Sequence, residues 1–119
     1  MMTKELRLKL EKDIKHAAHG SVVYGEAIIL RYKKTANKNS RFVIVVSAKV
    51  SKKAVVRNLL RRRISAILMA TEPYMPTKVD CLISLKTNAK DLNFSQLKLE
   101  IWKTFLKARL VSRSSLLQN

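Results

Sequence analysis

Residues 49–69 have the sequence KVSKKAVVRNLLRRRISAILM, in which a run of cations passes into an amphipathic helix. Apolar side chains recur in it every three or four residues, the spacing that aligns side chains along one side of an α-helix. The positions concerned are Val56, Leu60, Ile64 and Ile67. This side is predicted to pack on a hydrophobic core, which would fix the direction in which the opposite side faces.

The opposite side of this helix is basic. On a projection of about 100° per residue, Arg57 and Arg61 fall on one flank. Asn58 and Arg62 fall together further round. Guanidinium groups pair in a two-pronged manner with phosphate and stay charged at physiological pH. Because the stretch contains no acidic residue, this face is predicted to bind phosphate; taken alone, the segment also fits a merely solvated basic helix face.

The whole chain is strongly basic. It has 119 residues, with 25 Lys and Arg against 8 Asp and Glu, and a formal net charge of +17. Since 47% of the residues are hydrophobic, we expect one folded domain over residues 1–119, with a frayed tail over about residues 111–119. Nucleic acid is the polyanion that such a charge suits. No membrane partner is expected, because no window approaches the roughly 20 apolar residues that span a bilayer.

Cysteine and histidine give no sign of a metal or redox site. Cys81 lies in an apolar stretch and is the only cysteine, so a buried structural thiol is expected. His16 and His19 have no partners at metal-ligand spacing, which disfavours zinc. The N-terminal sequence lacks the continuous apolar core of a secretory signal. A cytoplasmic location is therefore expected, without a small-molecule substrate.

The chain before the basic stretch is predicted to form a helix and then strands. Residues 3–18 are rich in helix formers, and their helix would be capped by Thr3 and ended by Gly20 in a left-handed turn. Leucine and other apolar residues at positions 6, 10, 14 and 17 would form its apolar side. Residues 22–34 carry β-branched and aromatic side chains interrupted near Gly25, which predicts two strands joined by a turn or bulge.

Residues 41–49 give the strongest strand signal in the chain. Five apolar residues follow one another without a breaker. Continuous apolarity is typical of strands buried on both faces, so this strand is predicted to lie in the centre of a sheet. The basic helix is expected to run to about Ala70, where a segment with two prolines stops it. Residues 79–85 predict a further strand.

The last element is predicted to be a helix over residues 94–110, capped by Asn93 or Ser95. The element order is then αβββαβα. This order indicates an α/β (α+β) two-layer sandwich, with a small mixed sheet of about four strands and three helices packed mainly on it.

Residues 46–63, VSAKVSKKAVVRNLLRRR, resemble the signature of the bacterial ribonuclease P protein component, whose pattern runs approximately VSKKVGKKAVVRNRIKRR. Arg7 and Leu8, followed by Asp13, resemble the opening motif of that family. The third predicted strand and residues 79–110 are similar to later parts of the family pattern. The resemblance therefore covers nearly the whole chain, and its Arg-Asn motif is much more specific than a generic basic run.

This resemblance implies a role in a ribonucleoprotein endoribonuclease. Members of the family assist a large catalytic RNA that removes the 5′ leader from precursor tRNA, so both RNAs are implied partners. The chemistry and its Mg²⁺ are expected in the RNA partner; no cofactor, metal ligand or catalytic residue is expected in this chain. The family fold contains a left-handed βαβ crossover, which the predicted order of strand, helix and strand accommodates, although the usual hand is right.

The family's RNA-facing motif can be carried over by position. The matching residues are Lys49, Lys52, Lys53, Arg57, Asn58, Arg61, Arg62 and Arg63. Arg63 falls nearer the core side, so it is expected to snorkel first and to contact RNA second. Leu59 and Ser65 replace basic positions of the pattern. Leu59 lies beside the apolar face, so the exchange of charge for burial there is expected to be mild. The reduced charge indicates either a smaller RNA footprint or compensation by the three consecutive arginines that follow Leu60.

The resemblance also implies a cleft between the sheet and the first helix that holds the single-stranded leader. Arg31 and Tyr32 end the second strand and are candidates for this cleft, the tyrosine as a stacking surface. Ile14 and Ala18 stand where the family pattern has phenylalanines. Because stacking contributes roughly 1–3 kcal/mol per base, leader binding is expected to be weaker here.

Three other functions fit the sequence less well. A small ribosomal-type or RNA-chaperone protein would have the same charge, and only the motif argues against it. A protein-only nuclease would need positioned metals or an acid and base, whereas the 8 carboxylates are scattered along the chain. A membrane-surface or calmodulin-type helix would need a free apolar side, which the core is expected to occupy.

Overall fold

The computed structural model describes residues 2–114. It contains three α-helices and four strands in the order αβββαβα, which confirms the predicted α+β class. The helices are α1 (Glu11–Ala18), α2 (Ala54–Thr71) and α3 (Phe94–Lys107). The strands are β1 (Ser21–Tyr24), β2 (Ile28–Lys34), β3 (Arg41–Val45) and β4 (Val79–Leu85). Short 3-10 turns occupy Lys4–Leu6, Glu72–Tyr74 and Thr87–Asp91.

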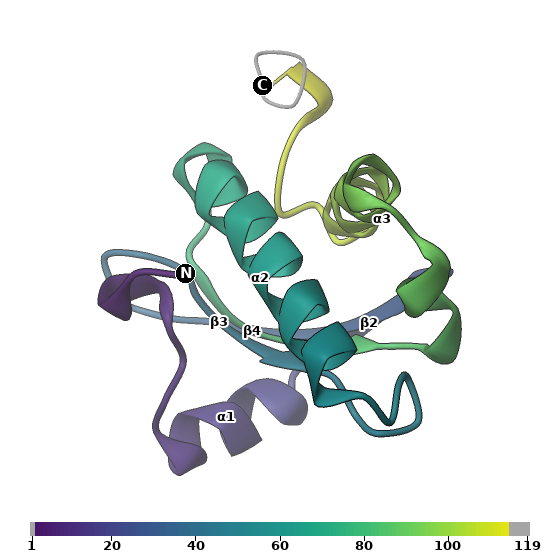
Figure 1. The fold of residues 1–119 in the computed structure, drawn as a ribbon. Helices are drawn as coiled ribbons and strands as arrows, with labels where there is room; N and C mark the ends of the chain where they lie inside the picture. Colours follow the sequence, from purple (N-terminus) through teal and green to yellow (C-terminus); the bar gives the residue numbers. More distant parts are fainter. Residues whose placement is uncertain (1, 115–119) are drawn as a thin grey trace.

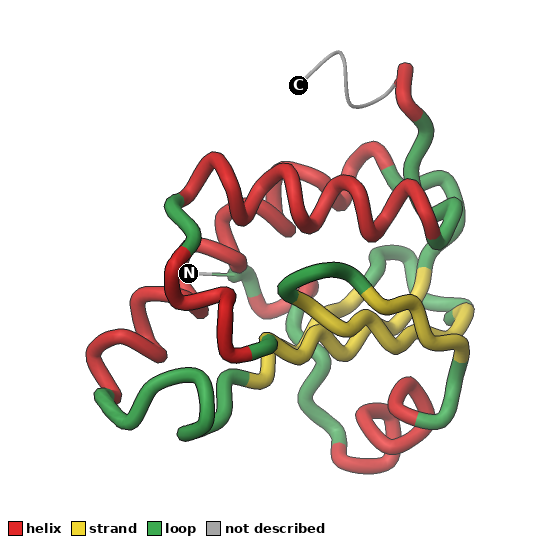
Figure 2. Tube along the Cα trace, turned by 90° about the vertical axis from the view of Figure 1, so that its right-hand side faces the viewer, coloured by secondary structure: helices red, strands yellow, loops and turns green. Residues whose placement is uncertain are grey.

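The four strands form one mixed sheet in the order β1-β2-β4-β3. Strands β1, β2 and β4 pair antiparallel, whereas β3 and β4 pair parallel, with Phe42 opposite Cys81. Helix α2 therefore connects two parallel neighbours, as a βαβ unit requires. Helices α2 and α3 lie over one face of the sheet, and α1 lies against the other (Figures 1 and 2).

The prediction that β3 is a central strand is wrong. It lies at the edge of the sheet, and its Val45 is 41% exposed. Its outer edge is partly covered by the N-terminal segment, where the Leu8 amide donates to the Phe42 carbonyl at 2.9 Å. A strand covered by a helix on one side and by a short chain segment along its edge can thus be as apolar as a central strand.

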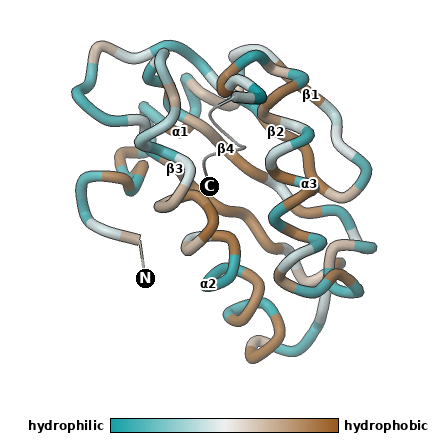
Figure 3. The backbone as a smooth tube through the Cα atoms, turned by 90° about the horizontal axis from the view of Figure 1, so that it is seen from above, coloured by the Kyte–Doolittle hydropathy of each residue, from teal (hydrophilic) through white to brown (hydrophobic). Residues whose placement is uncertain are grey.

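The core lies between the sheet and the pair α2 and α3. Alternate residues of β4 point into it, and these are Val79, Cys81, Ile83 and Leu85. From the helices it receives Leu60, Ile64, Leu68, Leu97, Ile101 and Phe105, all at most 2% exposed. In Figure 3 both helices alternate between brown and teal along their length, as expected of helices with one apolar side.

The first helix is shorter than predicted. It begins at Glu11, and Leu10 is 57% exposed rather than part of an apolar side. Residues 7–10 are extended because Arg7 forms a bridge with Phe42 of β3. Thr3 makes no capping hydrogen bond. A helical start would remove this edge contact, which the alternating sequence RLKL is suited to make.

Gly20 has no left-handed conformation, contrary to the prediction. Glycine is needed there for a different reason: a Cβ atom would lie 2.1 Å from the Tyr32 carbonyl oxygen. Gly25 is similarly enclosed, since a Cβ would lie 2.6 Å from Thr104 Oγ1. Beside it, the buried Glu100 carboxylate accepts from the amides of Ala27 and Ile28 and ties the β1–β2 connection to α3.

The remaining boundaries agree closely with the predictions. Helix α2 ends at Thr71, one residue later than expected, and the Pro-containing turn follows. Asn93, not Ser95, caps α3, through a reciprocal capping box with Gln96. Val111 is only 6% exposed, so the frayed tail does not begin there. The part of that tail from residue 115 onward lies outside the described residues.

Candidate nucleic-acid interface

Helix α2 is fixed by its apolar side. Leu60 is 2% exposed and Ile64 is fully buried, while Val56 packs at the border of the core. Leu59, expected beside the apolar face, is 38% exposed, so little burial accompanies its loss of charge. Ser65, the other position at which the basic pattern is lost, is buried. The helix therefore cannot rotate, and the side opposite the core is held toward solvent.

Two of the predicted arginines fold back onto the loop before α2. Arg57 Nη1 donates to the Ser51 carbonyl at 2.8 Å, and Arg61 Nη2 reaches the Val46 carbonyl at 3.4 Å. Arg61 Nη1 also donates to Asn58 Oδ1 at 2.8 Å. Both arginines are half-buried, because each guanidinium folds onto a carbonyl of this loop. They fix the shape of the loop over residues 46–53 and keep their charge at its surface.

Most of the other polar side chains of the motif are open to solvent. Exposed side chains are those of Lys49, Lys52, Lys53, Asn58 and Arg62, and Arg63 is half-buried as expected. The first turn of α2 has no acidic residue and no side-chain cap. Its free amide groups and the positive end of the helix dipole add to the cationic potential of the loop.

No acid neutralises this surface within residues 2–114. The ion pairs in that range join Lys15 to Glu11, Arg41 to Asp13 and Asp80, and Lys78 to Glu72. All of them lie outside residues 49–63. We define the basic face as the exposed and half-exposed cations of residues 49–63; none of them forms an ion pair within residues 2–114.

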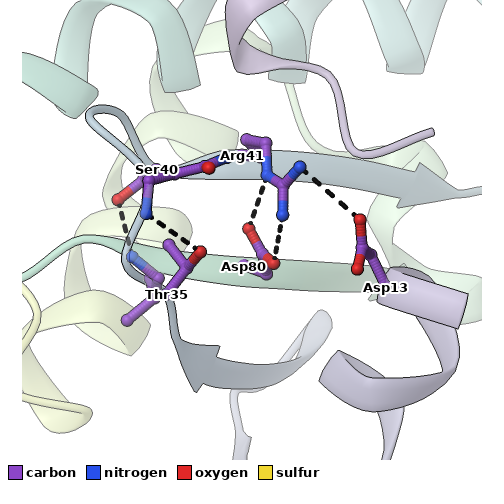
Figure 4. A network of polar contacts seen from close by, with 7 residues as sticks. Asp13, Thr35, Ser40, Arg41 and Asp80 are labelled. Atoms are coloured by element: carbon purple, nitrogen blue, oxygen red, sulfur yellow. Dashed lines mark hydrogen bonds and ion pairs between the residues drawn. The ribbon is translucent and has the colours of Figure 1, made fainter. Parts of the chain in front are cut away.

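Arg41 connects the edge strand β3 to its neighbour β4 and to helix α1 (Figure 4). Its guanidinium binds Asp80 of β4 through Nε at 2.9 Å and Nη2 at 2.7 Å. Its Nη1 lies 3.6 Å from Asp13 Oδ2 of α1. The hydrogen bonds to Asp80 raise the pKa of Arg41 further above its ordinary value, against a smaller opposing effect of burial. This network holds α1 on the face of the sheet away from α2.

The four residues predicted for the leader cleft do not all lie together. Ile14 and Ala18 are half-buried on α1. Tyr32 packs against the core on the opposite face of the sheet, and its hydroxyl donates to the Ala108 carbonyl after α3 at 3.5 Å. Arg31, its neighbour in β2, points to the α1 face because successive strand residues alternate. Tyr32 therefore does not belong to the predicted cleft, whereas Arg31 lies on the same face of the sheet as α1.

One concave surface was not predicted from the sequence. A groove of about 650 Å³ lies between the N-terminal segment, the edge strand β3 and helix α2. We call it the N-terminal groove. Its lining residues are Met2, Arg7, Leu8, Lys9, Phe42, Val43, Ile44, Val55, Asn58, Arg61, Arg62 and Ser65. The alternation of basic and apolar residues in RLKL was the available signal that Arg7 and Lys9 belong to an extended segment beside the sheet.

Metal, reactive-thiol and membrane-spanning features were also sought among the described residues. Residues 2–114 contain no group of three or more His, Cys, Asp or Glu side chains arranged to hold a metal ion. Cys81 is fully buried, and its burial raises the pKa of the thiol well above the ordinary value. None of the helices in this range combines the length and apolarity needed to cross a membrane.

The sequence is similar to ribonuclease P proteins. A model of the family described as Ribonuclease P matches residues 2–109. The chain is similar to the ribonuclease P protein component of Onion yellows phytoplasma strain OY-M, with 32% identity over 112 residues, covering 92% of this chain and 79% of that protein. It is also similar to the component of Limosilactobacillus reuteri strain DSM 20016, with 28% identity over 116 residues, covering 96% and 98%.

Solved structures share the fold. The Staphylococcus aureus RNase P protein at 2.0 Å superposes with a TM-score of 0.80 at 20% identity, covering 90% of this chain and 98% of that one. The Thermotoga maritima RNase P protein in complex with 1-(4-fluorophenyl)-2-thiourea gives a TM-score of 0.74 at 22% identity, covering 82% and 94%. At these identities the likeness establishes the arrangement of helices and strands.

Proposed function

Because this chain belongs to the bacterial ribonuclease P protein family, we propose that it is the protein subunit of a ribonuclease P ribonucleoprotein. In this role it assists a large catalytic RNA in removing the 5′ leader from precursor tRNA. The observation that supports the proposal most directly is the basic face, whose cations have no acidic partner among residues 2–114. We place this function in the cytoplasm.

The proposal gives the RNA and this chain different roles. Phosphodiester hydrolysis is assigned to the RNA, together with its Mg²⁺. This chain supplies guanidinium and ammonium groups that bind phosphates along the RNA. Arg57 and Arg61 act twice, since they hold the loop over residues 46–53 by hydrogen bonds to its carbonyls and add charge to the same surface.

We assign the leader of the precursor tRNA to the side of the sheet that carries α1. Arg31 supplies a cation there, and Ile14 and Ala18 supply apolar contact without rings. Stacking on aromatic side chains contributes roughly 1–3 kcal/mol per base. Since Tyr32 faces the other side of the sheet, leader affinity is expected to depend more on phosphate contacts and on salt than on stacking.

Reconstitution tests the proposal. The protein is mixed with the catalytic RNA of its own organism and a precursor tRNA at low Mg²⁺, and release of the 5′ leader is followed over time. Faster cleavage than by the RNA alone is expected, and a control with an unrelated basic protein of equal charge should not give it. No acceleration at saturating protein, together with recovery of ribosomal RNA in a pull-down, would instead favour a ribosomal-type or RNA-chaperone function.

A further inference from the structure

The N-terminal groove combines an apolar floor with a cationic rim. Leu8, which is 4% exposed, and the half-buried Ile44 form the floor, and Val55, which is 77% exposed, lies at the mouth. Arg7, Lys9, Arg61 and Arg62 stand around it, and no acidic side chain lines it. An uncharged partner would match only the floor, and a second copy of a chain with net charge +17 would be repelled. The groove is complementary to a ligand that is both flat and apolar and attached to a negative charge.

The edge of β3 adds directed hydrogen-bonding groups. The Phe42 carbonyl points out of the sheet, because it accepts from the Leu8 amide at 2.9 Å. Residues two apart in a strand direct their backbone groups to the same edge. Ile44 therefore presents one N–H donor and one carbonyl acceptor beyond the point where the N-terminal segment leaves the strand. A donor and an acceptor side by side match the edge of a nucleobase.

The helix side of the groove supplies further polar groups. Arg61 Nη1 donates to Asn58 Oδ1 at 2.8 Å, so the Asn58 amide is oriented with its NH₂ group left to donate. Arg62 is exposed one position further on. Planar guanidinium groups can stack on a base and also pair with its phosphate.

We propose that the N-terminal groove holds one unpaired nucleotide of the RNA that lies on the basic face. The base rests on the apolar floor with its edge toward Ile44, and the flanking phosphates meet Arg7, Lys9 and Arg62. The inference rests on the proposed function, since the same α2 side chains border both surfaces, and it adds a site for a base to a surface that otherwise contacts only phosphates.

A titration followed by NMR separates base binding from phosphate binding. Labelled protein is titrated with adenosine 5′-monophosphate, with uridine 5′-monophosphate and with inorganic phosphate. Either nucleotide should shift the Ile44 amide and the Val55 methyl groups in a saturable way, whereas inorganic phosphate should leave both unmoved. Equal shifts with phosphate alone, or nucleotide shifts confined to α1 and the opposite face of the sheet, would overturn the inference.

Variants that fill the groove without removing charge provide the second test. Ser65→Leu places a larger side chain in the lining, and Val55→Trp covers the mouth from an exposed position. Either should abolish the nucleotide shifts at Ile44 and weaken binding of the catalytic RNA about tenfold. Ala66→Leu is the matched control, since Ala66 is exposed and outside the lining. Circular dichroism checks that each variant is folded. If Ser65→Leu does not fold, the test rests on Val55→Trp.

The outcomes distinguish this inference from the proposed function. If the unchanged protein accelerates cleavage but neither variant alters RNA affinity, the groove holds no base and the proposed function stands. If the unchanged protein fails to bind the catalytic RNA, the proposed function fails, while nucleotide shifts at Ile44 would still report a base site for another RNA.

Discussion

Arg41 of β3 and Asp80 of β4 form a two-pronged ion pair across the parallel strands, with Nε to Oδ1 at 2.9 Å and Nη2 to Oδ2 at 2.7 Å. The pair lies on the face of the sheet that α1 covers, and the same guanidinium is 3.6 Å from Asp13 of that helix. One side chain thus joins the edge strand, its neighbour and the first helix. This contact links α1 to the face of the sheet on which the surface assigned to the leader lies.

Asp80→Asn should lower the free energy of unfolding by about 1.5–3 kcal/mol, the range for hydrogen bonds to charged groups. Asp80 is 9% exposed, so solvent replaces the lost partner poorly. Urea unfolding measures the change. Asp91→Asn, at an exposed carboxylate, should change stability by less than about 0.5 kcal/mol. Equal effects of the two substitutions would mean that the pair does not organise the sheet.

Leu60→Ala should destabilise the protein by about 2–5 kcal/mol, because it removes a buried side chain from a close-packed core. Leu59→Ala is the matched control on the adjacent residue of α2, where the side chain is 38% exposed. It should cost much less. Denaturant unfolding of both variants compares the two faces of the helix directly; a larger loss for Leu59 would show that the helix is rotated from the position described.

Asn93→Ala should cost about 1 kcal/mol, the typical value for an N-cap. The Asn93 side chain accepts from the Gln96 amide at 2.9 Å, and the Gln96 side chain accepts from the Asn93 amide at 2.9 Å. Ser95→Ala changes a side chain that makes neither bond. Thermal melts of the two variants are expected to differ by several degrees, with the Asn93 variant lower.

Cys81 should not react with alkylating reagents in the folded protein at neutral pH, because its thiol is fully buried and its pKa is raised. Unfolding in urea should restore ordinary reactivity. The raised pKa also makes the stability depend on pH. Above about pH 9 the thiol ionises in the unfolded chain but stays protonated in the folded protein, which lowers the free energy of unfolding. The stability advantage of the natural protein over Cys81→Ala should therefore shrink as pH rises past that value. Rapid alkylation of the folded protein at pH 7 would contradict the burial.

Patterns within one element were predictable from the sequence, and relations between elements were less so. The apolar spacing around Leu60 and Ile64 fixed which side of α2 is buried, since a helix has only one such side. The edge position of β3 was not predictable, because apolarity does not distinguish cover by a strand from cover by a helix and the N-terminal segment. The true start of α1 depends on the same contact between Arg7 and Phe42.

In the candidate site, too, exposure along one helix was predictable, whereas contacts between elements were not. The exposure of Lys52, Lys53 and Arg62 follows from the helical projection and the loop before it. The fold of Arg57 toward the preceding loop depends on where the Ser51 carbonyl lies, which no pattern specifies. Tyr32 was assigned to the wrong face because the sequence gives the alternation along β2 but not which face meets α1.

The most direct test of the account measures RNA affinity against salt for two charge-matched double variants. Lys53→Ala with Arg62→Ala removes two cations of the basic face, and Lys90→Ala with Lys103→Ala removes two exposed cations near and on α3. If the natural protein contacts about 6–10 phosphates, its affinity for the catalytic RNA should fall by about three to five orders of magnitude between 50 and 200 mM salt. The first variant should lower the slope of log affinity against log salt by about 2, and the second should leave it unchanged. Equal slopes for both variants and the natural protein would contradict the claim that α2 and its preceding loop bind the RNA backbone.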